Sequence, residues 1–205
     1  MELSERQNDA LTELINIAFS RTAASLSELT GHRVLLDVPQ VSLYPISNLS
    51  NELAKFLPAD IATVHQVFTG PLAGDALLLL NYEGAVMLTE LLTDEHAQSR
   101  RLDESAREVL TEIGNILLNA CLGVFGNLLH VRVSFSVPRL HLENLSEIVE
   151  SLVKDKDEVR YALVIYTAFR LRDSSVKGFM VVALSVASLD RLIQEVEKWE
   201  QRQGQ

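Results

Sequence analysis

Two parts of the sequence carry the same polar pair at the same spacing. Glu13 is followed three residues later by Asn16, and Glu112 is followed three residues later by Asn115. In both copies an acidic residue stands four positions before the glutamate, and a proline follows the asparagine after twenty-two intervening residues, so all shared positions are offset by 99. These additional positions are Asp9, Pro39, Glu108 and Pro138. The recurrence at one register makes the two pairs the first candidates for chemistry.

An α-helix would bring the members of each copy onto one face. Successive helical residues turn by about 100°, so positions three and four apart are neighbours. The polar faces would hold Asp9, Glu13, Asn16 and Ser20 in the first copy and Glu108, Glu112, Asn115 and Asn119 in the second. Apolar residues occupy the opposite faces, so each pair is predicted to face solvent or a partner. A side-chain amide placed there can both donate a hydrogen bond to a water molecule and accept one from it.

A solvated surface is the alternative interpretation of such a pair. For one copy alone it is the more common explanation, because glutamate and asparagine are mostly exposed residues. An ancestral duplication would also explain the matching register without any function. It would not explain why the glutamate and the asparagine stayed while the residues around them diverged, so the repeated pair favours a functional role.

The elements that would position the pairs can be read from hydrophobic periodicity and from capping residues. In the first half they are a long helix capped by Ser4 and stopped by Gly31, an alternating strand at Val34–Val41 with Pro39 at an edge or bend, a short helix at Leu49–Phe56, strands at Ala62–Phe68 and Ala76–Leu80, and a helix at Gly84–Leu92. In the second half they are a long helix at Ser105–Leu129, a strand at His130–Val137 followed by Pro138, a short helix at Leu145–Val153, strands at Tyr161–Leu171 and Gly178–Ser185, and a closing helix at Leu189–Trp199.

The repeated order of elements predicts the fold class. We expect a single α+β domain over residues 1–205, made of two repeats at about 1–95 and 101–199 and joined by the polar stretch Thr93–Leu102. Each repeat would contain a long helix, strands, a short helix, a strand hairpin and a final helix. We expect the two repeats to be related by a pseudo-two-fold axis and to share one antiparallel sheet.

Composition narrows the classes of function. The formal net charge of −10 argues against nucleic acid as a partner, because phosphate binding needs clustered lysine and arginine. The single cysteine, Cys121, cannot form an internal disulfide, which favours a reducing compartment. The N-terminal residues have no signal-peptide pattern, and the apolar stretches Ala76–Leu80 and Phe179–Ala187 are too short to cross a bilayer. We therefore expect a soluble, cytoplasmic protein with no membrane partner.

Motifs for metals, nucleotides and nucleophilic catalysis are absent from the sequence. None of the five histidines has another histidine three or four residues away, and no cysteine cluster accompanies them. Neither a glycine-rich phosphate loop nor a Gly-x-Ser-x-Gly turn is found. Cys121 falls near the apolar face of its helix and is predicted to be a packed core residue. The sequence therefore predicts no metal site and no cofactor of its own.

The repeated motif resembles the signature of the CheC/CheX/FliY family of chemotaxis phosphatases. That signature is an aspartate or serine, three residues, a glutamate, two residues, an asparagine, twenty-two residues and a proline. The first copy fits it fully, whereas the second departs at Glu108, which is longer than aspartate by one methylene. The likeness covers essentially the whole chain, and two motifs with little sequence outside them are most similar to the layout of CheC proteins.

The resemblance implies an activity and a division of roles. Family members hydrolyse the aspartyl phosphate of a phosphorylated CheY-like response regulator, so Glu13, Asn16, Glu112 and Asn115 become the expected catalytic residues. The asparagines would orient the attacking water, and the glutamates would dock to a lysine of the regulator. The regulator would supply the Mg²⁺. The receptor deamidase CheD is a further partner that the resemblance implies. Two sites in one chain make a monomer a more natural expectation than an obligate dimer.

Two other functions remain open at this point. The protein could be a non-enzymatic adaptor that binds the phosphorylated regulator and CheD. It could also be a flagellar switch scaffold, which is the weaker alternative because related switch domains need not keep the Glu–Asn pairs.

Overall fold

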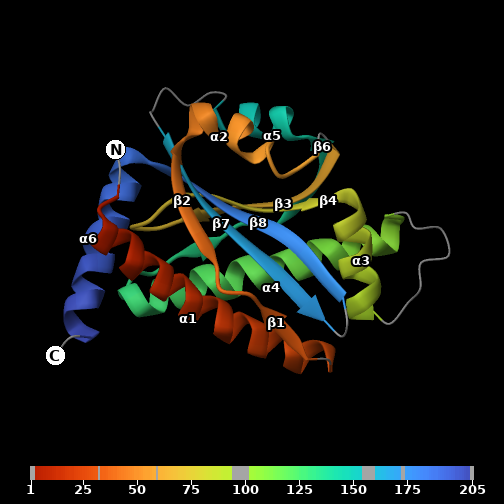
Figure 1. Ribbon diagram of the computed structural model, residues 1–205, viewed down its shortest axis with the longest axis horizontal. Coiled ribbons are helices and arrows are strands. Elements are labelled where there is room, and N and C mark those ends of the chain that lie inside the picture. The colour runs from red at the N-terminus through yellow and green to blue at the C-terminus, as the bar shows by residue number, and fades with distance from the viewer. Residues whose placement is uncertain are drawn as a thin grey trace.

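The computed structural model describes residues 3–31, 33–58, 60–93, 102–153, 160–171 and 174–203. In these residues an eight-stranded antiparallel sheet separates two layers of helices. The long helices lie on one face of the sheet and two short helices lie on the other (Figure 1). The predicted α+β class with a shared antiparallel sheet is confirmed. The predicted linker falls mostly on residues 94–101, which lie outside the described part of the chain.

The two halves contain the same succession of elements. The first half contains α1 (Glu5–Thr30), β1 (Val34–Leu36), β2 (Gln40–Pro45), α2 (Ile46–Leu53), β3 (Asp60–Thr69), β4 (Gly74–Asn81) and α3 (Tyr82–Thr93). The second half contains α4 (Glu104–Leu129), β5 (Ser134–Phe135), β6 (Arg139–Asn144), α5 (Leu145–Val153), β7 (Arg160–Leu171), β8 (Ser174–Ser185) and α6 (Val186–Gln203).

The strand order shows that each half completes its sheet with strands from the other. The main path is β1-β7-β8-β4-β3-β5, with β2 also paired to β7 and β6 also paired to β3. The strands β1 and β2 of the first half therefore pair with β7 of the second half. In the same way, β5 and β6 of the second half pair with β3 of the first half. The hairpin strands β4 and β8 meet at the centre. The extents of the two repeats stay a prediction, but their strands are interleaved in one sheet.

The long helices begin and end where local chemistry predicts. Ser4 accepts a hydrogen bond from the backbone of Gln7, whose side chain accepts one from Ser4 in return, and this capping box starts α1. Gly31 ends α1 at φ +69°, a left-handed conformation that costs glycine little. Asp103 caps the start of α4, and His130 ends α4 at φ +57°. The predicted cap and stop of the first helix are thus confirmed.

The predicted strands that follow the long helices are wrong in their bounds. Each was expected to end at or near the motif proline, but Pro39 and Pro138 instead separate a very short strand from a longer one that follows. Proline has no N–H to donate into the ladder, so pairing is interrupted there and resumes after it. His130 belongs to a helix end and not to a strand. The short helix α2 also begins earlier than predicted, at Ile46, because Ile46, Leu49 and Leu53 form its buried face.

A buried ion pair joins the two halves on the short-helix side. The Arg160 guanidinium donates to the Asp75 carboxylate at 2.6 Å, to Ala183 O at 2.9 Å and to Leu152 O at 2.9 Å. Both charged side chains are 5% exposed. His65 Nε2 lies 3.1 Å from the other oxygen of Asp75. Arg160 thereby links the start of β7 to β4, to β8 and to the end of α5.

One described helix, α4, is long and apolar enough to cross a membrane by length and composition. Half of that stretch is buried inside the protein. The buried side of α4 packs against α1, α3 and β3 and contributes to the larger core. Cys121 is part of that core, as predicted, and burial raises the pKa of its thiol to about 12.

Candidate functional site

The first Glu–Asn pair lies on the outer face of α1. Glu13 is exposed and Asn16 is half-buried, whereas Leu14, Ile15 and Ala18 on the other side are fully buried. The motif residue Asp9 is also exposed. Helical periodicity predicted this orientation, and the structure agrees. The roles assigned to the side chains stay predictions.

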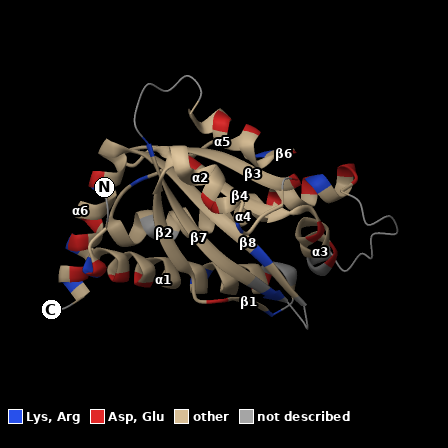
Figure 2. Cartoon of the chain, turned by 45° about the horizontal axis from the view of Figure 1, so that its top comes forward, with Lys and Arg blue, Asp and Glu red and all other residues tan. Residues whose placement is uncertain are grey.

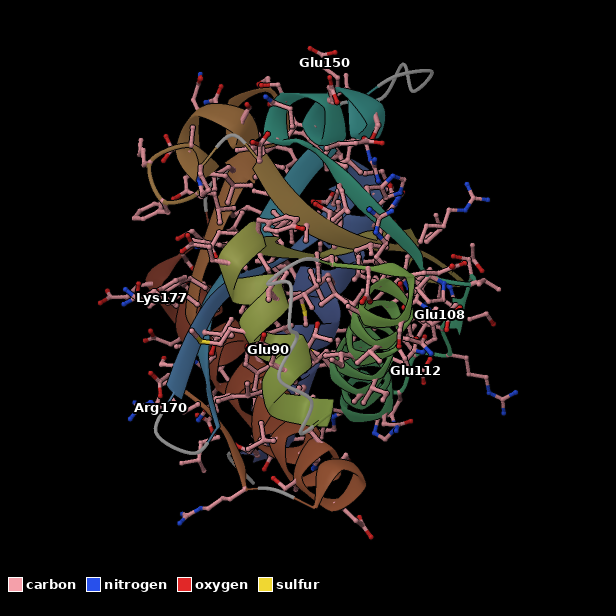
Figure 3. All side chains as sticks on the ribbon, turned by 90° about the vertical axis from the view of Figure 1, so that its right-hand side faces the viewer. Glu90, Glu108, Glu112, Glu150, Arg170 and Lys177 are labelled. Carbon is pink, nitrogen blue, oxygen red and sulfur yellow. The ribbon has the colours of Figure 1, made fainter. Side chains whose placement is uncertain are left out.

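The second pair lies on the equivalent face of α4. Glu108 and Glu112 are exposed, and they lie on the same side of the helix, turned away from α3 (Figure 3). Asn115 is half-buried. Because α1 and α4 pack against each other beneath the sheet, the protein carries two similar polar faces on neighbouring helices (Figure 1).

The loops before the motif prolines are tied to the sheet in the same way. Asp37 N donates to Ala168 O at 3.0 Å, and Ser136, its counterpart at an offset of 99, donates to Val67 O at 2.9 Å. A side chain from the same strand also donates to the carbonyl of each loop residue. These two bonds run from Thr167 Oγ1 to Asp37 O at 3.0 Å and from Gln66 Nε2 to Ser136 O at 2.7 Å.

Asn115 is held by three hydrogen bonds from its surroundings. Its Oδ1 accepts from Asn119 Nδ2 at 2.6 Å and from Gln66 Nε2 at 3.3 Å, and its Nδ2 donates to Glu112 Oε2 at 3.3 Å. Gln66 is almost fully buried, with 1% of its surface exposed. Gln66 therefore connects Asn115 to the loop that precedes Pro138. Elements from both halves thus meet at this site, since Gln66 comes from β3 and Asn115 from α4.

The site around Asn16 is more open. Ser20, the counterpart of Asn119, donates to the backbone carbonyl of Asn16 at 2.8 Å and not to its side chain. Within the described ranges, no hydrogen bond to the Asn16 amide is found. The structure therefore brings the second pair and its proline loop together through Gln66, and it does not link Asn16 to Pro39 in that way.

The electrostatic surroundings favour a cationic partner group. Asp and Glu residues are distributed along α1 and over α6 (Figure 2). Neither Glu13 nor Glu112 takes part in an ion pair with another described residue. In the part of the chain that the structure describes, no group of three His, Cys, Asp or Glu side chains could hold a metal ion. The site can therefore offer an exposed carboxylate and an amide to a group that arrives from outside.

No protein-family model matches the chain. The flagellar motor switch phosphatase FliY of Bacillus subtilis (strain 168) is 24% identical over 148 residues, which cover 71% of this chain and 38% of FliY. The CheY-P phosphatase CheC of the same organism is 22% identical over 199 residues, which cover 93% of both chains. The crystal structure of Thermotoga maritima FliY superimposes with a TM-score of 0.80 at 19% identity and covers 97% of this chain and 100% of that chain. The chain is thus similar in sequence to the CheC and FliY proteins of the CheC/CheX/FliY family, and it shares the fold of FliY.

The family motif does not include two kinds of residue that the structure places beside it. Val38 and Val137 directly precede the motif prolines and are 72% and 83% exposed, which is unusual for valine. Their shared offset of 99 is a signal that the sequence already contained. Gln66 is the second kind, and no local pattern marks it, because it lies 49 residues from Asn115 in the chain.

Proposed function

We propose that this protein hydrolyses the aspartyl phosphate of a CheY-like response regulator at two sites. The observation that carries the proposal is the pair of Glu–Asn motifs at one register on the outer faces of α1 and α4. The names of two relatives support it, since one is called a CheY-P phosphatase and the other a flagellar motor switch phosphatase. The matched segment covers 38% of the FliY relative, so only the part of FliY that aligns is relevant here.

Asn16 and Asn115 orient the attacking water in this proposal. Phosphoryl transfer passes through a loose transition state, so the protein must supply position more than covalent chemistry. The carbonyl oxygen of an amide accepts a hydrogen bond from the water and points a lone pair of the water toward phosphorus. No strong base is needed, because the leaving carboxylate is already a good leaving group. Half-buried amides beside exposed carboxylates suit a surface on which the partner completes the site.

Glu13 and Glu112 dock the partner. Each carboxylate would pair with the lysine that a response regulator carries beside its phosphorylated aspartate. An exposed ion pair contributes only about 0–1 kcal/mol, but exclusion of water by the closing interface strengthens it. The Mg²⁺ comes with the regulator, so no metal ligand is required from this chain. We also propose that one chain suffices for activity, since it carries both motifs. CheD remains a proposed partner on the strength of the sequence resemblance.

Decay of the phosphorylated regulator, with and without this protein, tests the proposal. Wild-type protein should accelerate decay, and the double variant Asn16→Ala/Asn115→Ala should lose the acceleration by about 100-fold, as expected when a positioning group is removed. Asn127→Ala, an exposed asparagine on α4 outside the motif, is the matched control and should retain full activity. Affinity for the beryllofluoride-activated regulator should be unchanged in both variants. Binding without any acceleration by the wild type would instead support the adaptor function.

A further inference from the structure

The two sites differ at two positions that surround the asparagine. Gln66 and Thr167 both donate to the loop carbonyl before the motif proline, so they occupy equivalent places in the two halves. Asn119 and Ser20 are equivalent by the offset of 99. At the second site both residues, Gln66 and Asn119, are amides that also reach Asn115. At the first site both residues, Thr167 and Ser20, carry hydroxyls, and both bond to backbone carbonyls instead. We call Gln66, Asn115 and Asn119 the amide cluster.

The direction of every hydrogen bond in the amide cluster is fixed by obligatory acceptors. Ser136 O can only accept, so the Gln66 atom that faces it must be the NH₂ group. The Glu112 carboxylate likewise requires the NH₂ group of Asn115 on its side. Asn115 therefore turns its carbonyl oxygen toward Gln66 and Asn119, and both of these must donate to it. Two donors fill the two lone-pair positions of Asn115 Oδ1.

A close approach of α4 to the sheet makes this contact possible. Gly114 precedes Asn115, and a Cβ atom added there would lie 2.6 Å from Val64 of β3. Val64 and Gln66 point to the same face of β3, because side chains alternate along a strand. The counterpart of Gly114 in α1 is Ile15, a fully buried side chain. The missing side chain at Gly114 thus allows α4 to lie close enough to β3 for Gln66 to reach Asn115.

We propose that Gln66 and Asn119 are positioning residues that keep the second site in a resting state, so that the first site turns over faster. The inference rests on the proposed function. A water-orienting amide needs a free lone pair on its carbonyl oxygen, and the amide cluster occupies both on Asn115. Asn16 carries no such restraint from the described residues. For the Asn115 carbonyl oxygen to accept from a water, the 3.3 Å hydrogen bond from Gln66 must break. Gln66 then keeps its shorter bond to Ser136 O.

An exchange of residues between the halves tests the inference on activity. In an Asn16→Ala background only the second site can act, and Gln66→Thr/Asn119→Ser should raise its rate about 2- to 10-fold, the effect of one net hydrogen bond. In an Asn115→Ala background, Ser20→Asn should lower the rate of the first site, because it supplies the same donor four residues after the asparagine that Asn119 supplies at the second site. The change should appear in kcat at saturating regulator and not in KM. A second site that is already faster than the first, or that slows after the exchange, would overturn the inference.

A measurement on the isolated protein separates this inference from the proposed function. Side-chain amide resonances of Asn16 and Asn115 can be assigned by their loss in the two alanine variants. The Asn115 resonance should differ from that of Asn16 in the wild type and move toward it in Asn119→Ser, a milder change on a partly exposed helix face. Absence of that shift shows that the amide cluster does not restrain Asn115, whatever the regulator assay gives. If the shift occurs but no variant accelerates regulator decay, the phosphatase function fails while the restraint stands.

Discussion

Replacing Gly114 by alanine should destabilise the protein, although alanine normally stabilises a helix. The added Cβ would lie 2.6, 2.6 and 2.7 Å from three atoms of Val64. Val64 is 1% exposed and sits in the middle of β3, so it cannot turn away. Relief to an ordinary contact of about 3.4 Å therefore requires α4 and β3 to separate by roughly 0.8 Å locally.

Gly123 in the same helix supplies the control, because a Cβ added there would meet nothing within 4 Å. Both substitutions gain the same helix propensity, about 1 kcal/mol relative to glycine. The difference between them is then the cost of overpacking, about 1–3 kcal/mol. Gly123→Ala should raise the free energy of unfolding above that of the wild type. The free energy of unfolding of Gly114→Ala should be lower than that of Gly123→Ala by about 1–3 kcal/mol.

Urea unfolding with equal m-values for the three proteins measures the difference directly. The separation should also lengthen the 3.3 Å bond between Gln66 and Asn115 beyond hydrogen-bond range, so the Asn115 amide resonance should move toward that of Asn16. If Gly114→Ala is as stable as Gly123→Ala, the close approach of α4 to β3 does not exist as described. The explanation for why Gln66 reaches Asn115 would then be wrong as well.

Three further outcomes follow from the site and the core. Replacing Glu13 and Glu112 by lysine should weaken binding to the beryllofluoride-activated regulator at least 10-fold, since each carboxylate is assigned to a lysine of the regulator. Unchanged affinity with lowered turnover would instead place the glutamates in the chemical step. Arg160→Met should lower the free energy of unfolding by about 3–5 kcal/mol, because it removes the arginine that pairs with the buried Asp75 carboxylate. Adding Asp75→Leu should recover much of this loss. No recovery would show that the buried charge of Asp75 is not the cause of the loss. Burial raises the pKa of the Cys121 thiol from 9.0 to about 12, so just above pH 9 only the unfolded chain loses this proton. The free energy of unfolding should therefore fall above pH 9, relative to that of a Cys121→Ala variant. Parallel pH profiles of the two proteins would show that the thiol does not ionise differently on folding.

The elements that depend on local sequence could be predicted. Helical periodicity gave the long helices and their outer faces, and Ser4 and Gly31 marked the ends of α1. The duplication at an offset of 99 indicated two similar halves, and the sheet they share was an expectation that only the structure confirms. The interleaving of strands could not be predicted in this way, because β1 and β2 pair with a strand more than a hundred residues later. Such pairings are decided by tertiary packing and leave no local pattern.

The same distinction explains what was missed at the site. The motif residues lie on single helices and show themselves by spacing, whereas Gln66 acts across the sheet on a residue of the other half. Its neighbours in sequence form an ordinary strand, and a buried glutamine there has no signature until its partners are known. Val38 and Val137 were detectable from their common offset, but nothing in the sequence showed how exposed they are.

The two loops before the motif prolines are held alike, so the difference between the two sites comes from the residues around each asparagine. Both loops before the motif prolines make the same backbone bond to the neighbouring strand, and both receive a side-chain donor at the same carbonyl. Thr167 satisfies that carbonyl with a hydroxyl, which has no further donor to offer. Gln66 satisfies it with one N–H and has a second N–H that reaches Asn115. Gln66→Thr therefore removes one donor from the Asn115 carbonyl oxygen while it preserves a side-chain donor to the loop carbonyl, so the loss of restraint can be measured with the loop still held.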